Sequence, residues 1–206
     1  MANNVSFYAT INGSFEVDDK LREMFDVVKE EDSNAWNSWS AEDLPIYETP
    51  QTDEGWYAWG CENMGAKWVC IEDVDGASFS GHSAWSPPIA LVINLVKTLV
   101  ELTGEDLSAT INYEDEFRNF IGVDHISSQD GHIEHDENFV DGDELTDLVE
   151  EAFGMSVDDD KFDWWDETMK TKAGNTWSPQ EYIDEVVSDF WHSGKISDLG
   201  EIHGTV

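Results

Sequence analysis

The sequence predicts an α+β protein built on an antiparallel sheet, and two observations support this class. Segments with strand periodicity and segments with helix periodicity follow one another in the order strand, helix, strand, strand, helix, strand. The two middle strands flank Asp75-Gly76, a dipeptide typical of a hairpin turn. This order is the split arrangement of a ferredoxin-like fold, in which two helices cover one face of an antiparallel sheet.

The first elements follow from the spacing of apolar residues. Residues 5–12 alternate apolar and polar side chains, which predicts the first strand. Residues 16–29 carry apolar side chains at helical spacing, which predicts the first helix. Residues 30–55 are acidic and contain Trp36 and Trp39, so we expect a long insertion with little regular structure.

The later elements complete the sheet. Residues 68–74 and 77–84 are the predicted hairpin strands, and residues 107–113 alternate as a further strand. A helix is predicted over 88–102, because two prolines lie at its start, where a missing N–H costs least, and Gly104 ends it. These elements supply the second half of the sheet domain.

The chain beyond residue 139 has a different pattern. Helices are predicted over 143–153 and 179–191, the second with Ser178 as N-cap and Glu181 in the capping-box position. We expect a sheet domain over residues 1–139, containing the insertion, and an acidic helical extension over 140–206 packed on it.

Charge is the most unusual property of the chain. Asp and Glu number 46 against 10 Lys and Arg, which gives a net charge of -36. Residues 1–139 hold 28 acids and 6 bases, net -22, and residues 140–206 hold 18 and 4, net -14, so both parts are acidic. Because such a surplus destabilises a compact chain by self-repulsion, we expect a cationic partner, a salt-rich environment or bound cations to account for it.

Composition and charge exclude several classes of protein. Ten Trp, ten Phe and five Tyr indicate a folded chain, since disordered acidic chains are poor in aromatic residues. The longest apolar run, 89–100, is shorter than the roughly 20 residues that span a bilayer. The amino terminus lacks the basic and apolar blocks of a secretory signal, which predicts a cytoplasmic protein. Direct nucleic-acid binding is disfavoured, because it relies on Lys and Arg to neutralise phosphates.

Two short segments carry a resemblance to a known family. Residues 55–68 (GWYAWGCENMGAKW) and 83–88 (SAWSPP) resemble the Api92-like, YubB ferredoxin-like family of bacteriophages and plasmids. The resemblance covers residues 1–135, and Met64 stands where that family has Trp. It implies a mobile-element origin and the fold already predicted, and it brings no catalytic residue.

The same segments are expected to be a structural motif. Four tryptophans should lose most of their exposure to one another and to the second helix, as large core residues do. The residues of this motif are Trp56, Trp59, Asn63, Gly65, Lys67, Trp68, Trp85, Pro87 and Pro88.

Metal and catalytic motifs are weak. The turn around Asp75 matches part of an EF-hand loop, but Ile71 and His82 stand at its first and twelfth positions, where acidic ligands belong. His132 and His135 could meet Asp124 and Asp136 at a transition metal, yet a spacing of three on a strand places side chains on opposite faces. We therefore expect no metal site and no cofactor. The sequence has no phosphate loop, G-x-S-x-G or H-E-x-x-H, so it is not predicted to be an enzyme.

The acidic helices carry the expected binding surface. Carboxylates at spacings of three and four place charges about 5–6 Å apart on one helix face. Duplex DNA carries a charge about every 1.7 Å of its axis, so an ordered carboxylate array can imitate its field. The expected partner-binding residues are Glu144, Asp147, Glu150, Glu151, Asp158, Asp159, Asp160, Asp163, Asp166 and Glu167.

These observations predict a phage-type acidic inhibitor, a DNA mimic that occupies the nucleic-acid-binding site of a host defence or DNA-processing protein. The alternative is a phage-encoded interaction module that binds a host factor through its aromatic motif surface, with acidity as a solubility or salt adaptation. The layout of charge distinguishes them, because mimicry needs a continuous negative stripe, whereas salt adaptation spreads carboxylates evenly.

Overall fold

The computed structural model describes residues 3–31, 39–47, 53–156 and 168–196 of the chain. The chain divides into two compact units. Unit 1 comprises residues 1–117 and 124–137, and unit 2 comprises residues 118–123 and 138–206. None of the helices in the described ranges is long and apolar enough to cross a membrane.

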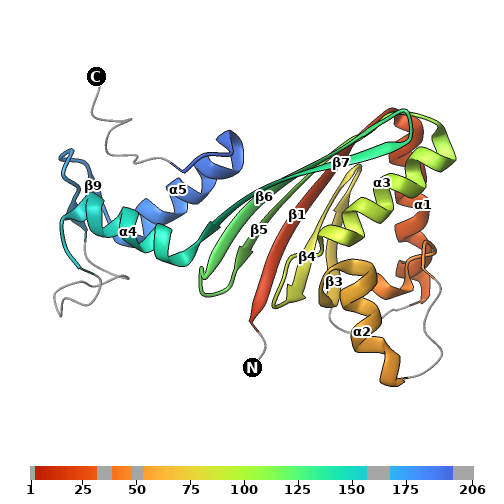
Figure 1. The fold of residues 1–206 in the computed structure, drawn as a ribbon, viewed down its shortest axis with the longest axis horizontal. Coiled ribbons are helices and arrows are strands. Elements are labelled where there is room, and N and C mark those ends of the chain that lie inside the picture. The colour runs from red at the N-terminus through yellow and green to blue at the C-terminus, as the bar shows by residue number, and fades with distance from the viewer. Residues whose placement is uncertain (1–2, 32–38, 48–52, 157–167, 197–206) are drawn as a thin grey trace. The chain divides into compact units, whose positions relative to one another are not determined.

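A large antiparallel sheet is the central element of the fold, which confirms the α+β class. Its strand order is β2-β3-β4-β1-β5-β6-β7 (Figure 1). The strands are β1 (Asn4–Asn12), β2 (Trp39–Ser40), β3 (Lys67–Asp75), β4 (Ser78–Ala84), β5 (Ser108–Asp115), β6 (Phe120–Gln129) and β7 (His132–Asp141). The helices beside it are α1 (Phe15–Glu31), the short η1 (Ala41–Asp43), α2 (Asp53–Met64) and α3 (Ile89–Thr103).

The six elements predicted for the sheet domain match the structure closely. Strands β1, β3, β4 and β5 and helices α1 and α3 each begin and end within two residues of the predicted bounds. β1 lies between β4 and β5 and is antiparallel to both. The sheet nevertheless has seven strands, because β2, β6 and β7 extend the four that were predicted.

Alternation along β1 explains how unit 1 builds its core. Val5, Phe7, Ala9 and Ile11 are buried, while the residues between them face outward. Helices α1 and α3 pack against each other beside the sheet (Figure 1). The ring of Phe25 on α1, for example, lies 5.2 Å from a core phenylalanine ring on β4.

The hairpin of β3 and β4 contains a close backbone approach. The predicted turn is present, with Gly76 in the left-handed region at φ 59°. The pairing shifts register between Lys67 and Cys70 and again between Ile71 and Asp73. At Gly81 an added Cβ would lie 1.9 Å from the backbone oxygen of Cys70, so this position requires glycine.

Helix α2 lies partly within the stretch that was predicted to be irregular. The residues Asp53–Met64 form a helix although aromatic, glycine and polar residues surround its axis on all sides. Such a helix has no apolar stripe, so its sequence lacks the periodicity by which helices are predicted. It packs against α3 and β3 instead of presenting one apolar face to a core.

Unit 2 is mainly helical. It contains α4 (Gly142–Phe153), the short strands β8 (Met169–Lys170) and β9 (Thr176–Trp177), and α5 (Pro179–Ser193). The predicted capping box of α5 is confirmed, since the Ser178 and Glu181 side chains each bond the other's backbone N–H. Its core joins residues from both helices to Ile121, Val123 and Val140 of the β6 and β7 strands.

Candidate functional site

Helix α4 separates its apolar and acidic residues onto two faces. The Asp141 side chain caps the helix by accepting a hydrogen bond from the Glu144 N–H at 3.0 Å. One face buries four apolar residues, Leu145, Val149, Ala152 and Phe153. The opposite face exposes Asp143, Glu144, Asp147 and Glu151, which we call the α4 carboxylate stripe. Their spacings of three and four residues make them neighbours on the helix surface.

Most of the predicted acidic residues on α4 are available to a partner. Glu144, Asp147 and Glu151 are exposed, whereas Glu150 is half-buried and accepts a hydrogen bond from Ser156 Oγ at 3.0 Å. The other predicted members of the surface, Asp158, Asp159, Asp160, Asp163, Asp166 and Glu167, lie outside the described residues.

Helix α5 has the same division. Tyr182, Ile183, Val186, Val187 and Phe190 are buried, and the exposed side carries carboxylates. One of them, Asp184, is paired with Arg118, so it is partly neutralised. The exposed Glu185 extends the acidic surface of α5. Both helices of unit 2 therefore present acidic outer faces.

The outward face of the central strands is, in contrast, almost free of carboxylates. The outward positions, which alternate with core positions, are Asn4, Ser6, Tyr8, Thr10 and Asn12 on β1, Ser78, Ser80 and His82 on β4, and Ser108, Thr110, Asn112 and Glu114 on β5. Glu114 is the one acidic residue among these positions of the three strands. Exposed carboxylates therefore largely avoid the outward face of β1, β4 and β5, whereas α4, α5, β3 and β7 each carry several.

The segment that carries the family resemblance accepts hydrogen bonds at its main-chain carbonyls, one of them from a side chain of α3. The Asn63 carbonyl accepts hydrogen bonds from Tyr47 Oη at 3.2 Å and from Asn94 Nδ2 at 2.8 Å. The Gly65 carbonyl accepts a bond from Ser86 Oγ at 2.9 Å. These bonds hold the end of α2 beside the turn that leads into α3.

The prolines and Trp59 of the motif have structural positions. Pro88 is the N-cap residue of α3, and the Pro87 carbonyl accepts from the N–H of the first helical residue. Trp59 is half-buried, and its ring lies 5.2 Å from the Tyr47 ring in an edge-on contact. Trp56 lies in α2, but its side chain is outside those described. Lys67 begins β3, where it pairs with Ala84 on β4.

The prediction that Trp68 and Trp85 are buried is wrong. Their relative exposures are 59% and 52%, so more than half of each side chain meets solvent. Both also have left-handed backbones, with φ of 50° and 74°. A bulky residue in this region is an outlier that costs on the order of 1–3 kcal/mol and persists only when its surroundings enforce it. Neither burial nor backbone preference explains tryptophan at these two positions.

A buried hydrogen-bonded carboxylate lies deeper in unit 1. Asp124 on β6 is 1% exposed, and its Oδ1 accepts a hydrogen bond from the Tyr113 hydroxyl at 3.1 Å. Its Oδ2 lies 2.6 Å from Nε2 of His135 on β7. Burial raises the pKa of Asp124, although the two hydrogen bonds oppose this shift. Burial and the neighbouring Asp124 charge raise the pKa of the Tyr113 hydroxyl in turn.

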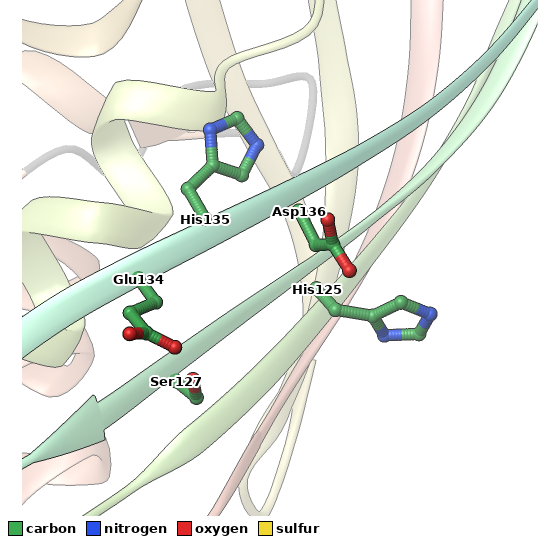
Figure 2. A pocket seen from close by; sticks show the side chains of 5 residues that line it. All are labelled: His125, Ser127, Glu134, His135 and Asp136. Carbon is green, nitrogen blue, oxygen red and sulfur yellow. The ribbon is translucent and has the colours of Figure 1, made fainter.

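A shallow polar hollow of about 510 Å³ adjoins this network on β6 and β7 (Figure 2). Its lining residues are His125, Ser127, Glu134, His135 and Asp136. In Figure 2 the His135 ring points away from the other side chains, as alternation along β7 requires. The His125 ring is fixed by a 3.2 Å contact between its Nδ1 and Thr110 Oγ1.

The candidate metal ligands from the sequence do not converge. His135 contacts Asp124, but within the described ranges no three His, Cys, Asp or Glu side chains are grouped as a metal site requires. The sequence pattern suggests His135 and Asp124 only as metal ligands and does not predict the hydrogen bond between them. A polar residue at a core-facing position of a strand was the available signal, because such residues need buried partners.

Comparison with known proteins does not place the chain in a family. No family model matches it, and neither a curated protein nor a solved structure matches it.

Proposed function

We propose that this protein is an acidic inhibitor of phage type that occupies the nucleic-acid-binding site of a basic host protein. The proposed target is a defence or DNA-processing protein in the cytoplasm of an infected bacterium. The acidic faces of unit 2, including the α4 carboxylate stripe, contact the host protein. In this mode the protein carries out no reaction and needs no cofactor.

The uneven layout of charge is the observation that supports this proposal most. If acidity served only solubility or salt tolerance, outward positions of β1, β4 and β5 should carry carboxylates as often as other exposed positions. They carry one, Glu114, whereas four exposed carboxylates follow one another along a single face of α4. A mimic of nucleic acid needs this kind of ordered array.

The net charge of -36 gives the proposal a kinetic basis. A strongly acidic protein is steered towards cationic clefts and is repelled by nucleic acid, so it competes for the protein partner and not for the phosphate chain. Steering acts over a Debye length of about 8 Å at physiological salt, so association should slow as salt rises.

The fold and the family resemblance support a mobile-element origin. Strands β3, β4, β1 and β5 lie in this spatial order with antiparallel neighbours. This order supports the proposal that they form a ferredoxin-like core with α1 and α3. We propose that β6 and β7 extend this core. The W-Y-x-W and A-W-S-P-P segments resemble the Api92-like, YubB family carried by phages and plasmids.

The test is capture of partners from bacterial lysate by the immobilised protein at low and high salt. A variant with Glu144→Gln, Asp147→Asn and Glu151→Gln should capture far less of a basic, nucleic-acid-binding protein at low salt. A matched control removes three exposed charges elsewhere, through Glu16→Gln and Asp26→Asn on α1 and Glu101→Gln on α3, and should capture nearly as much as the parent. Equal capture by all three proteins would contradict an α4 contact surface.

The exposure of Trp68 and Trp85 favours a second function. The chain would then be a phage-encoded module that binds a host factor through its aromatic motif surface, and its acidity would be a solubility or salt adaptation. Under this alternative, the α4 variant still captures its partner, and the amount of partner captured does not depend strongly on salt.

A further inference from the structure

Trp68 and Trp85 lie near each other at one end of the β3–β4 hairpin. Lys67 pairs with Ala84 at this end of the hairpin, and Trp68 and Trp85 each directly follow one member of that pair. Paired residues have Cα atoms about 4.5–5.5 Å apart, so the two tryptophans belong to the same end of the hairpin. Both indoles are more than half exposed. Together they form the aromatic pair of unit 1, defined as Trp68 and Trp85.

The backbone around this pair is held in place by several hydrogen bonds. The Trp85 N–H donates to the Asn3 carbonyl at 3.1 Å. The Ser83 hydroxyl donates to the Ser86 carbonyl at 2.7 Å, and the Ser86 hydroxyl donates to the Gly65 carbonyl at 2.9 Å. Strained conformations that the surroundings enforce are concentrated at binding and catalytic sites, where they hold a side chain ready for its ligand. A pre-organised backbone also reduces the conformational entropy lost on binding.

Charge selects the kind of ligand that this pair can bind. The electron-rich faces of indole rings attract cations, and tryptophan does so most strongly among the aromatic side chains. An exposed carboxylate, Glu116, lies at the same end of the sheet, where it accepts a hydrogen bond from the Asn4 N–H at 3.1 Å. In a chain of net charge -36, an anionic ligand is repelled at long range.

We propose that Trp68 and Trp85 form a binding site for arginine side chains of the basic partner. Arginine fits better than lysine, because its planar guanidinium stacks on aromatic faces and is more weakly hydrated than an ammonium group. The carboxylates steer the partner, and the aromatic pair selects arginine within it. This inference rests on the proposed function for the basic character of the partner, but it assigns a separate site in unit 1.

The test compares an oligoarginine peptide with an oligolysine peptide of equal length, with binding measured by calorimetry at low and moderate salt. The parent should bind oligoarginine more tightly than oligolysine, and by less than the roughly 5- to 30-fold that two whole exposed cation–π contacts are worth, because an ammonium group also binds indole faces. A double variant, Trp68→Asn with Trp85→Asn, should bind both peptides alike. Asn is chosen because it tolerates the left-handed backbone, so the melting temperature should stay the same or rise.

Two further variants keep the test decisive. Replacing both residues by Phe keeps the ring bulk and should reduce the preference for arginine only partly. Replacing Phe15, which is 74% exposed on α1, by Asn removes an aromatic residue elsewhere and should leave the preference unchanged. Retained preference in the Asn double variant overturns the arginine site, as does equal affinity of the parent for both peptides. Failure of both peptides to bind the parent at low salt overturns the proposed function instead.

Discussion

Asp147 is the residue of α4 on which like-charge repulsion is most concentrated. Acidic residues stand at all four helical neighbour positions, namely Asp143, Glu144, Glu150 and Glu151. Each like-charge pair at this spacing destabilises a helix by about 0.2–0.5 kcal/mol. The change Asp147→Asn should therefore raise the free energy of unfolding by about 1–2 kcal/mol. For a chain of this size, that corresponds to a rise in melting temperature of roughly 2–8 °C.

The assay is thermal unfolding followed by circular dichroism at low salt and at about 1 M salt, where the Debye length falls to about 3 Å. The gain should be present at low salt and largely lost at high salt. The control is Glu62→Gln on α2, which removes one charge but has no acidic residue three or four positions away. A melting temperature for Asp147→Asn that equals the control at low salt, or falls below the parent, would refute the repulsion argument.

Four other changes have defined outcomes. Because the pKa of Asp124 is raised above 3.8, its contribution to stability is present below that pH and is lost as pH rises through the folded-state value; Asp124→Asn should flatten this fall in pH-dependent unfolding. Asp124→Ala should cost about 1–3 kcal/mol in denaturant titrations, since it leaves the Tyr113 hydroxyl without its acceptor. Gly81→Ala should cost at least about 3 kcal/mol or prevent folding, because its Cβ would overlap backbone. Hydrogen bonds from Ser178 lower the pKa of Glu181 below 4.5, so its stabilisation is present above that pH and lost in acid; acid titration of Glu181→Ala should lack that loss.

Strong periodicity accounts for the parts of the fold that could be predicted. β1 alternates strictly, and α3 is apolar and bounded by proline and glycine, so local sequence determines both. β7 has no such alternation, since most of its side chains are exposed and charged, and its place beside β6 depends on long-range pairing. Helix α2 has no apolar stripe, so the spacing of its apolar residues does not predict a helix.

The candidate sites show the same limit. The exposed face of α4 follows from helical spacing, and the exposure of Glu144, Asp147 and Glu151 agrees with it. The exposure of Trp68 could not be predicted in this way, because a tryptophan in a strand is equally compatible with a core and with a binding surface. The scarcity of carboxylates on the outward face of β1, β4 and β5 depends on which strands are neighbours, and sequence spacing alone does not give that arrangement.

The central claim is that the acidic surface occupies a nucleic-acid-binding site, and competition tests it most directly. Duplex DNA or RNA is titrated into the complex of this protein with its captured host partner, and release of the protein is measured. The account predicts that nucleic acid displaces the parent protein completely, and that it displaces the Glu144→Gln, Asp147→Asn, Glu151→Gln variant at lower concentration. If saturating nucleic acid leaves the complex intact, and the variant binds as tightly as the parent, the account is contradicted.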